Sequence, residues 1–162
     1  MDIVIGIDLA RKGKHEAFGL ANPGEKLGSW RFDSRREDLE KILIEVQSEC
    51  EEEDTIHVVV EATGWSWLTV AQYFDENNCR VYRIQAEKAQ NFRKYLSKHT
   101  KNDRIDAKCL ARLWYVEPEY LDEIYLRDPD RFALKRLIKQ RGDFETDKQR
   151  YESRLGALLD GM

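Results

Sequence analysis

Hydrophobic residues near the N-terminus fall into three short runs separated by turn residues. Residues 2–9 form a β-branched run that ends close to an acid, and residues 15–21 and 26–32 follow as two further strand-like runs. Asn22-Pro23-Gly24, between the last two runs, is a strong turn signal. The pattern predicts a three-stranded antiparallel meander at the start of the chain.

Beyond the meander, helical and strand-like patterns alternate. A helix is predicted from Asp33-Ser34, where Glu37 and Ser34 have the spacing of a capping box. The remaining elements are strands at 55–60 and 79–84 and helices that follow Gly64, span 86–96 and span 103–115. The order β-β-β-α-β-α-β-α is that of the ribonuclease H topology. We therefore expect an α/β fold, an RNase H-like mixed sheet flanked by helices.

The last part of the chain carries a different pattern. From about Arg131 to Leu159, apolar residues recur in steps of three and four, interrupted by Arg141 and Lys148 and by no proline. This predicts one long amphipathic helix, with coiled-coil-like pairing favoured over packing on its own domain. We expect an α/β domain over 1–118, a linker and long helix over 119–162, and a homo-oligomer that is at least a dimer.

Charge is distributed unevenly along the chain. The net charge is −4, but residues 34–54 hold nine acids and three bases, whereas residues 80–112 hold ten Lys/Arg and three acids. A polyanion would meet the basic stretch rather than the average. On charge alone, a solvated helix face explains it equally well. The candidate nucleic-acid contacts in this stretch are Arg93, Lys94, Lys98, Lys101, Arg104 and Lys108.

The cysteines and the hydropathy indicate the cellular compartment of the protein. Cys50, Cys79 and Cys109 are far apart and form no CxxC pair, which fits a reducing cytoplasm and offers no zinc site. No apolar run approaches the roughly 18 residues that a membrane span needs. Asp2 and Asp8 interrupt the N-terminal apolar run, so a signal peptide is not predicted. We expect a cytoplasmic protein with no membrane partner.

Four acids stand out by their positions. Asp8 and Glu61 end predicted strands, and Asp103 and Asp106 share one face at a helix start. Converging carboxylates are tolerable when hard cations neutralise them, and oxygen ligands select Mg²⁺ or Mn²⁺. Two such ions about 4 Å apart would serve phosphodiester chemistry. The acids also have plainer explanations: a turn acid at Asp8, and helix caps at Glu61 and Asp103.

Three motifs in this order resemble a known family. They are Gly6-Ile7-Asp8, then Val60-Glu61-Ala62-Thr63-Gly64 followed by Trp65 and Trp67, then Lys101-Asn102-Asp103-Arg104-Ile105-Asp106-Ala107. Together they are similar to the DEDD-type transposases of the "one-ten" insertion-sequence family. The resemblance covers about residues 3–116 with motifs and extends into the helical tail.

The resemblance implies a RuvC-like catalytic domain over 1–118. In it Asp8, Glu61, Asp103 and Asp106 bind two divalent metal ions for DNA strand cleavage and transfer. Such proteins act on DNA as recombinases guided by a structured RNA. Their second domain carries a nucleophilic serine, and Ser66, Ser97 and Ser153 do not lie in a motif of that kind. The chain, ending at Met162, resembles a piece truncated before that domain, so we do not expect strand transfer from it alone.

Three other functions remain open. A stand-alone RuvC-like junction resolvase would use the same carboxylates, but the second and third motifs favour the transposase. A non-catalytic module for nucleic-acid binding and oligomerisation would need only the basic stretch and the helical tail, and metal binding separates it from both enzymes. A sugar-kinase-like or actin-like ATPase is the least favoured, because no Gly-rich phosphate loop follows the first strand.

Overall fold

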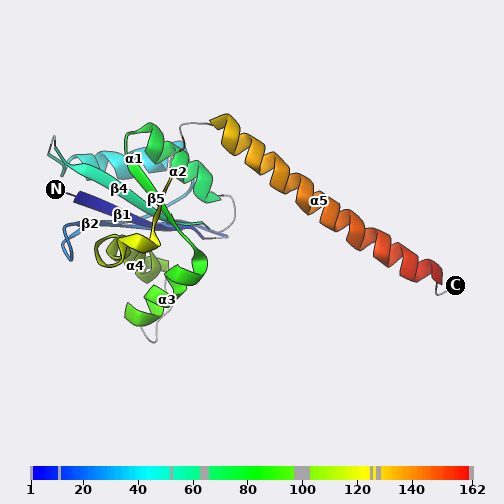
Figure 1. Ribbon diagram of the computed structural model, residues 1–162. Helices are drawn as coiled ribbons and strands as arrows, with labels where there is room; N and C mark the ends of the chain where they lie inside the picture. Colours follow the sequence, from blue (N-terminus) through cyan, green and yellow to red (C-terminus); the bar gives the residue numbers. More distant parts are fainter. Residues whose placement is uncertain are drawn as a thin grey trace. The chain divides into compact units, whose positions relative to one another are not determined.

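The structure is a computed structural model with two compact units, Met1–Tyr125 and Leu126–Met162. Each unit is described by itself. The first is an α/β unit built on a six-stranded sheet (Figure 1), and the second is a long helix. The residues that the structure describes are 2–10, 12–51, 53–62, 66–96, 103–124, 126 and 129–160.

The predicted meander is confirmed. Strands β1 (Asp2–Asp8), β2 (His15–Ala21) and β3 (Lys26–Phe32) pair in antiparallel fashion. Asn22 has a φ of 67° and Gly24 a φ of 103°, the left-handed conformation that a tight turn needs between two strands. In β1 all residues from 3 to 7 are buried, because helices cover both faces of the sheet at this strand.

The second half of the sheet adds parallel strands. Strand β4 (Thr55–Glu61) pairs with β1, and β5 (Arg80–Ile84) pairs with β4, both in parallel. A short antiparallel strand, β6 (Asp122–Ile124), completes the order β3-β2-β1-β4-β5-β6. The alternation of strands and helices that follows the meander is therefore confirmed.

Strand β6 was not predicted from the sequence. Two cross-strand ion pairs accompany it at the edge of the sheet: Arg80 with Glu123 at 3.1 Å and Arg83 with Asp122 at 3.4 Å. Because β6 belongs to the sheet, the first compact unit reaches residue 125 rather than the expected boundary at 118. Three residues are too few for an alternating pattern to be recognisable.

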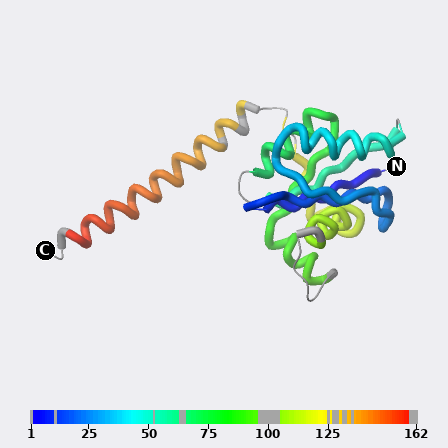
Figure 2. Tube along the Cα trace, turned by 180° about the vertical axis from the view of Figure 1, so that it is seen from behind, coloured from blue at the N-terminus to red at the C-terminus, as the bar shows by residue number. Residues whose placement is uncertain are grey.

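Helices cover both faces of the sheet, as both views show (Figures 1 and 2). On one face lie α1 (Arg36–Gln47) and α2 (Ser66–Glu76). On the other face α4 (Asp103–Val116) packs against β1 and β2, and α3 (Ala86–Leu96) packs against α4. A short 3-10 turn, η1 (Pro118–Tyr120), follows α4.

The predicted N-cap of α1, Ser34, is wrong by one residue. The N-cap is Arg35, whose side chain makes no capping hydrogen bond. The Ser34 hydroxyl lies 2.7 Å from Nε2 of His15 instead, so it provides a partner for one nitrogen of an imidazole that is only 8% exposed. Local spacing predicts a capping role for Ser34, but its hydroxyl instead contacts His15, which is buried and 19 residues away in sequence.

The second unit confirms the predicted long helix. Helix α5 (Pro129–Asp160) has 32 residues. Its large apolar side chains are exposed: Leu134, Leu137, Ile138, Phe144, Tyr151, Leu155 and Leu158. Among the described residues, no helix has the length and apolar character that a bilayer span requires.

Candidate functional site

Two of the predicted acids lie side by side at the ends of parallel strands. Ile7 of β1 is in register with Val60 of β4, and Asp8 and Glu61 each come one residue later. Side chains alternate along a strand, so Asp8 lies on the same face as Gly6 and Glu61 on the same face as Val59. Both acids therefore end their strands on the side of the sheet that α4 covers.

Helix α4 comes to this edge because β1 lets it approach closely. A Cβ added at Gly6 would lie 2.1 Å from the backbone oxygen of Ala107 and 2.4 Å from the backbone nitrogen of Ala111. The helix thus rests directly on the strand backbone, without a side chain between them. This contact lies just C-terminal to Asp106 on α4 and just N-terminal to Asp8 on β1, so it brings the third and first motifs together.

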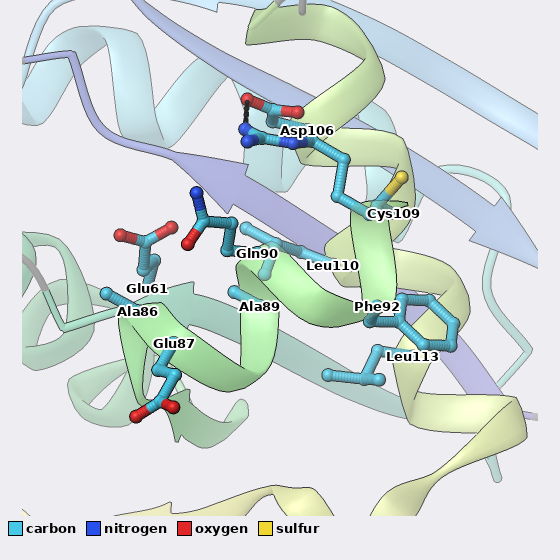
Figure 3. Close-up of a pocket in the computed structure, with 11 residues that line it drawn as sticks. Glu61, Ala86, Glu87, Ala89, Gln90, Phe92, Asp106, Cys109, Leu110 and Leu113 are labelled. Carbon is cyan, nitrogen blue, oxygen red and sulfur yellow. Dashed lines mark hydrogen bonds and ion pairs between the residues drawn. The ribbon is translucent and has the colours of Figure 1, made fainter. Parts of the chain in front are cut away.

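A cavity of about 380 Å³ opens between α3, α4 and the end of β4. Its charged lining residues include Glu61, Arg93 and Asp106, and its apolar wall includes Phe92 and Leu110. Figure 3 shows the Glu61 carboxylate on one side, the Asp106 carboxylate on the other and the Gln90 amide between them. The cavity lining therefore includes three carboxylates, those of Glu61, Glu87 and Asp106, with a guanidinium and an amide beside an apolar wall.

The Asp106 carboxylate has two unlike oxygens. Oδ2 accepts a hydrogen bond from Nη1 of Arg93 at 2.8 Å, and both side chains are largely buried. Oδ1 is buried and has no hydrogen-bond partner among the described residues. Leaving a buried polar atom unpaired costs on the order of 1–3 kcal/mol. A hard cation would satisfy this oxygen, so the residues present fit a divalent metal ion.

Cys109 lies one helical turn after Asp106 and also lines the cavity. Burial, and secondly the neighbouring Asp106 carboxylate, raise the pKa of the Cys109 thiol. The thiol therefore stays protonated near neutral pH, and a protonated thiol is neither a nucleophile nor a metal ligand. The polar chemistry of the cavity rests on its carboxylates.

The structure brings only part of the predicted metal site together. Glu61 and Asp106 line one cavity, whereas Asp8 ends the neighbouring strand and is not part of the lining. Asp103 begins α4, and its side chain lies outside the described residues. Within the described ranges, no three His, Cys, Asp or Glu side chains are grouped closely enough to hold a metal ion. The four-carboxylate site stays a prediction.

The predicted nucleic-acid contacts have separate surroundings. Arg93 is paired with Asp106, Lys94 is exposed on α3, and the Lys108 ammonium lies 5.6 Å from the ring centroid of Phe18. Lys98, Lys101 and the side chain of Arg104 lie outside the described residues. None of these contacts is tested by the fold itself.

Sequence reasoning missed Gln90 and the apolar wall of the cavity. Ala86, Ala89, Gln90 and Arg93 recur at steps of three and one on α3, so they share one helix face. This spacing can be recognised in the sequence. It indicates a helix face of small and polar residues, which leaves space beside α4.

Two curated relatives are similar to the chain over most of its length. The pilin gene-inverting proteins of Moraxella bovis and Moraxella lacunata are each 26% identical over 137 residues. That alignment covers 85% of this chain and 41% of each relative. The chain thus spans about two fifths of the length of these relatives.

Among solved structures, the fold is similar to that of RuvC from Thermus thermophilus. The complex of T. thermophilus RuvC with a Holliday junction substrate has a TM-score of 0.52 at 14% identity, over 76% of this chain and 100% of RuvC. A second Thermus thermophilus RuvC structure has a TM-score of 0.50 at 15% identity, over 75% of this chain and 99% of that one. At such low identity the likeness shows the fold, and it confirms the expected RNase H/RuvC-like class.

The sequence itself matches one family over nearly its whole length. A profile of the IS110 DEDD transposases, described as "Transposase", matches residues 5–162. This confirms the resemblance that the three motifs indicated. The chain belongs to the IS110 family of DEDD transposases.

Proposed function

We propose that this chain supplies the divalent-metal site of a DNA transposase/recombinase and that it cleaves DNA strands with Mg²⁺ or Mn²⁺. The observation that carries the proposal is the cavity that Glu61 and Asp106 both line, with one Asp106 oxygen buried and without a partner among the described residues. Family membership and the RuvC-like fold support a nuclease-type domain. The metal dependence and the residue roles are the proposed part.

In this proposal four acids would hold the metal ions: Asp8, Glu61, Asp103 and Asp106. Two bound ions would activate the attacking oxygen and stabilise the leaving oxygen of a phosphodiester. The chain's own residues orient the reaction. The Gly6 contact fixes α4 against β1, and the apolar wall at Phe92 and Leu110 limits water beside the carboxylates.

Nucleic acid would approach over the basic helices. Lys94 is exposed on α3, and the proposed phosphate contacts also include Lys98, Lys101, Arg104 and Lys108. RuvC of T. thermophilus forms a complex with a Holliday junction, which supports a branched DNA substrate for this fold. A structured guide RNA is proposed as a second partner. Binding no tighter to structured RNA than to an unstructured RNA of equal length would contradict the guide.

Assembly would use α5. Its exposed apolar side chains and the predicted coiled-coil pattern favour pairing with a second copy in the cytoplasm. We propose the α/β unit, Met1–Tyr125, as the catalytic domain and α5 as the assembly helix. A clean monomer by light scattering at high protein concentration would contradict the pairing.

The first experiment is Mn²⁺ binding by calorimetry, with and without a branched DNA. The chain is compared with Asp8→Ala and Asp106→Ala, and Asp122→Ala is the matched control. Asp122 pairs with Arg83 at the far edge of the sheet, so its loss removes a carboxylate but not the site. We expect both site variants to weaken Mn²⁺ binding at least tenfold and the control to change it little.

The opposite result favours the non-catalytic module. Mn²⁺ binding that is absent with and without DNA, or that neither site variant weakens, contradicts the metal site. DNA binding that persists under those conditions would then assign the chain to nucleic-acid binding and oligomerisation.

A further inference from the structure

Arg93, one of the predicted nucleic-acid contacts, pairs with a candidate metal ligand, Asp106. Its side chain is 22% exposed, and its Nη1 donates to Oδ2 of Asp106 at 2.8 Å. The guanidinium is therefore withdrawn from solvent and directed at a carboxylate. A residue whose task was to grip a phosphate backbone would gain by being exposed.

Only one of the two carboxylate oxygens of Asp106 accepts a hydrogen bond from Arg93. Arginine offers five donors and often binds a carboxylate through both oxygens at once. Here the structure gives a contact to Oδ2 alone, while Oδ1 is buried without a partner among the described residues. Arg93 thus holds one oxygen, and the other is closed to water and unpaired within the described residues. Asp106 as a residue lines the cavity that Glu61 also lines.

The packing of α3 on α4 fixes the relative positions of Arg93 and Asp106. Arg93 comes from α3 and Asp106 from α4, and the two helices pack against each other. Helix α4 is held against β1 by the Gly6 contact, so the Asp106 backbone has a fixed place. What remains free is rotation of the carboxylate about its own bonds, and the contact from Arg93 removes that freedom.

We propose that Arg93 is a positioning residue for metal binding: by holding Oδ2 of Asp106, it fixes the orientation of the carboxylate and leaves Oδ1 unpaired for a divalent cation. This inference rests on the proposed function, because it needs Asp106 to be a ligand. Groups that hold a metal ligand in orientation commonly change metal affinity by about 10–100-fold when they are removed.

A purely electrostatic role for Arg93 predicts the opposite sign. A positive guanidinium beside a cation site repels the cation, so its removal would strengthen metal binding. Loss of a positioning contact weakens it. The direction of the change in Mn²⁺ affinity therefore separates the two roles without any measurement of activity.

The test is Mn²⁺ titration of the 162-residue chain, with and without branched DNA, for Arg93→Met, Arg93→Lys and Asp106→Asn. The matched control is Arg80→Met, which breaks an ion pair of similar length, 3.1 Å to Glu123, at the sheet edge. We expect Arg93→Met to weaken Mn²⁺ binding about tenfold or more. Lysine should restore part of the loss, and the control should leave the affinity unchanged.

A double variant separates positioning from general damage. In an Asp106→Asn background, Arg93→Met should have no further effect on Mn²⁺ affinity, because there is no carboxylate left to orient. Melting curves for each variant show whether a change in affinity merely follows unfolding. An Arg93→Met protein that is folded and binds Mn²⁺ as tightly as the parent chain, or more tightly, overturns the inference.

The proposed function and this inference fail in different ways. If Asp106→Asn leaves Mn²⁺ binding intact, or the parent chain binds no Mn²⁺, the proposed metal site falls and the inference falls with it. If Asp106→Asn abolishes binding while Arg93→Met does not weaken it, the metal site stands and the positioning role alone is rejected.

Discussion

The α/β unit buries most of its large apolar side chains, whereas helix α5 exposes those that the structure describes. In the sheet unit, Phe74 and Leu113 are almost fully buried, and β1 is covered on both faces. In α5, Phe144 is 65% exposed and Leu137 is 61% exposed. Burial of apolar area is the main stabilising term in folding. The sheet unit therefore stabilises itself within one chain, whereas α5 keeps its apolar surface available for something outside its own unit.

The candidate site lies in the sheet unit alone. This unit contains the ion pair of the cavity, Arg93 with Asp106, and it also contains Asp8 and Glu61. Helix α5 holds exposed i,i+4 ion pairs, such as Arg141 with Glu145 at 2.9 Å, which contribute little to stability. The proposed chemistry therefore lies in the sheet unit and the proposed association on α5.

The largest expected effect is from truncation of equal side chains in the two regions. Phe74→Ala should lower the free energy of unfolding of the sheet unit by about 3–5 kcal/mol, because it empties a fully buried site. Phe144→Ala removes the same atoms from an exposed position and should leave that quantity almost unchanged. Urea denaturation followed by near-UV circular dichroism measures both. Similar losses in the two variants would end the distinction between the units.

A second test adds one methyl group in each region. Gly6→Ala should destabilise the sheet unit by about 3 kcal/mol, because the new Cβ meets the backbone of α4 rather than a side chain that can move aside. Gly142→Ala on α5 meets nothing within 4 Å and should stabilise the helix by about 1 kcal/mol. Thermal melts monitored at 222 nm give both changes. A Gly6→Ala protein as stable as the parent would show that α4 can shift away from β1 without loss.

The smallest effect is a pH dependence confined to the sheet unit. His57 is 3% exposed, with Nε2 at 3.0 Å from Oδ1 of Asp2, and its ring lies against Trp114. Burial lowers the pKa of His57 below its ordinary value of 6.5, although Asp2 opposes this. Between the two pKa values the unfolded chain binds more protons, so stability is present above about pH 6.5 and declines on acidification.

Two controls sharpen the pH test. Burial also lowers the pKa of His15, which adds to the decline in the same direction. Helix α5 contains no histidine, so its helicity should not change in this window. His57→Gln should flatten the pH profile of the melting temperature between about pH 5 and 7. A profile that rises on acidification, or that His57→Gln leaves unaltered, contradicts the assignment.

Regular elements could be predicted from the sequence because their patterns are local. The turn at Asn22 to Gly24, the buried run of β4 and the long period of α5 each carry enough residues to show a period. Strand β6 and the N-cap of α1 were not predicted correctly from the sequence. The first has three residues, and the second depends on His15, which is distant in sequence but close in space.

The site could be predicted in outline for a similar reason. The motifs selected Glu61 and Asp106, and both residues line one cavity. The pairing of Arg93 with Asp106 was not foreseen, because charge patterning treats a basic residue on a basic helix as solvent-facing. Which basic residue turns inward depends on how α3 packs on α4, and that is not written in the spacing of either helix.

The contact at Gly6 also bears on how this protein tolerates change over time. Side chains between a helix and a sheet act as spacers, and any substitution among them alters the separation. Where α4 rests on β1, the spacer is absent, and the gap is set by the thickness of two peptide backbones. Substitutions elsewhere in the core can therefore repack around the pair while van der Waals contact between the two backbones keeps the distance between the first and third motifs fixed.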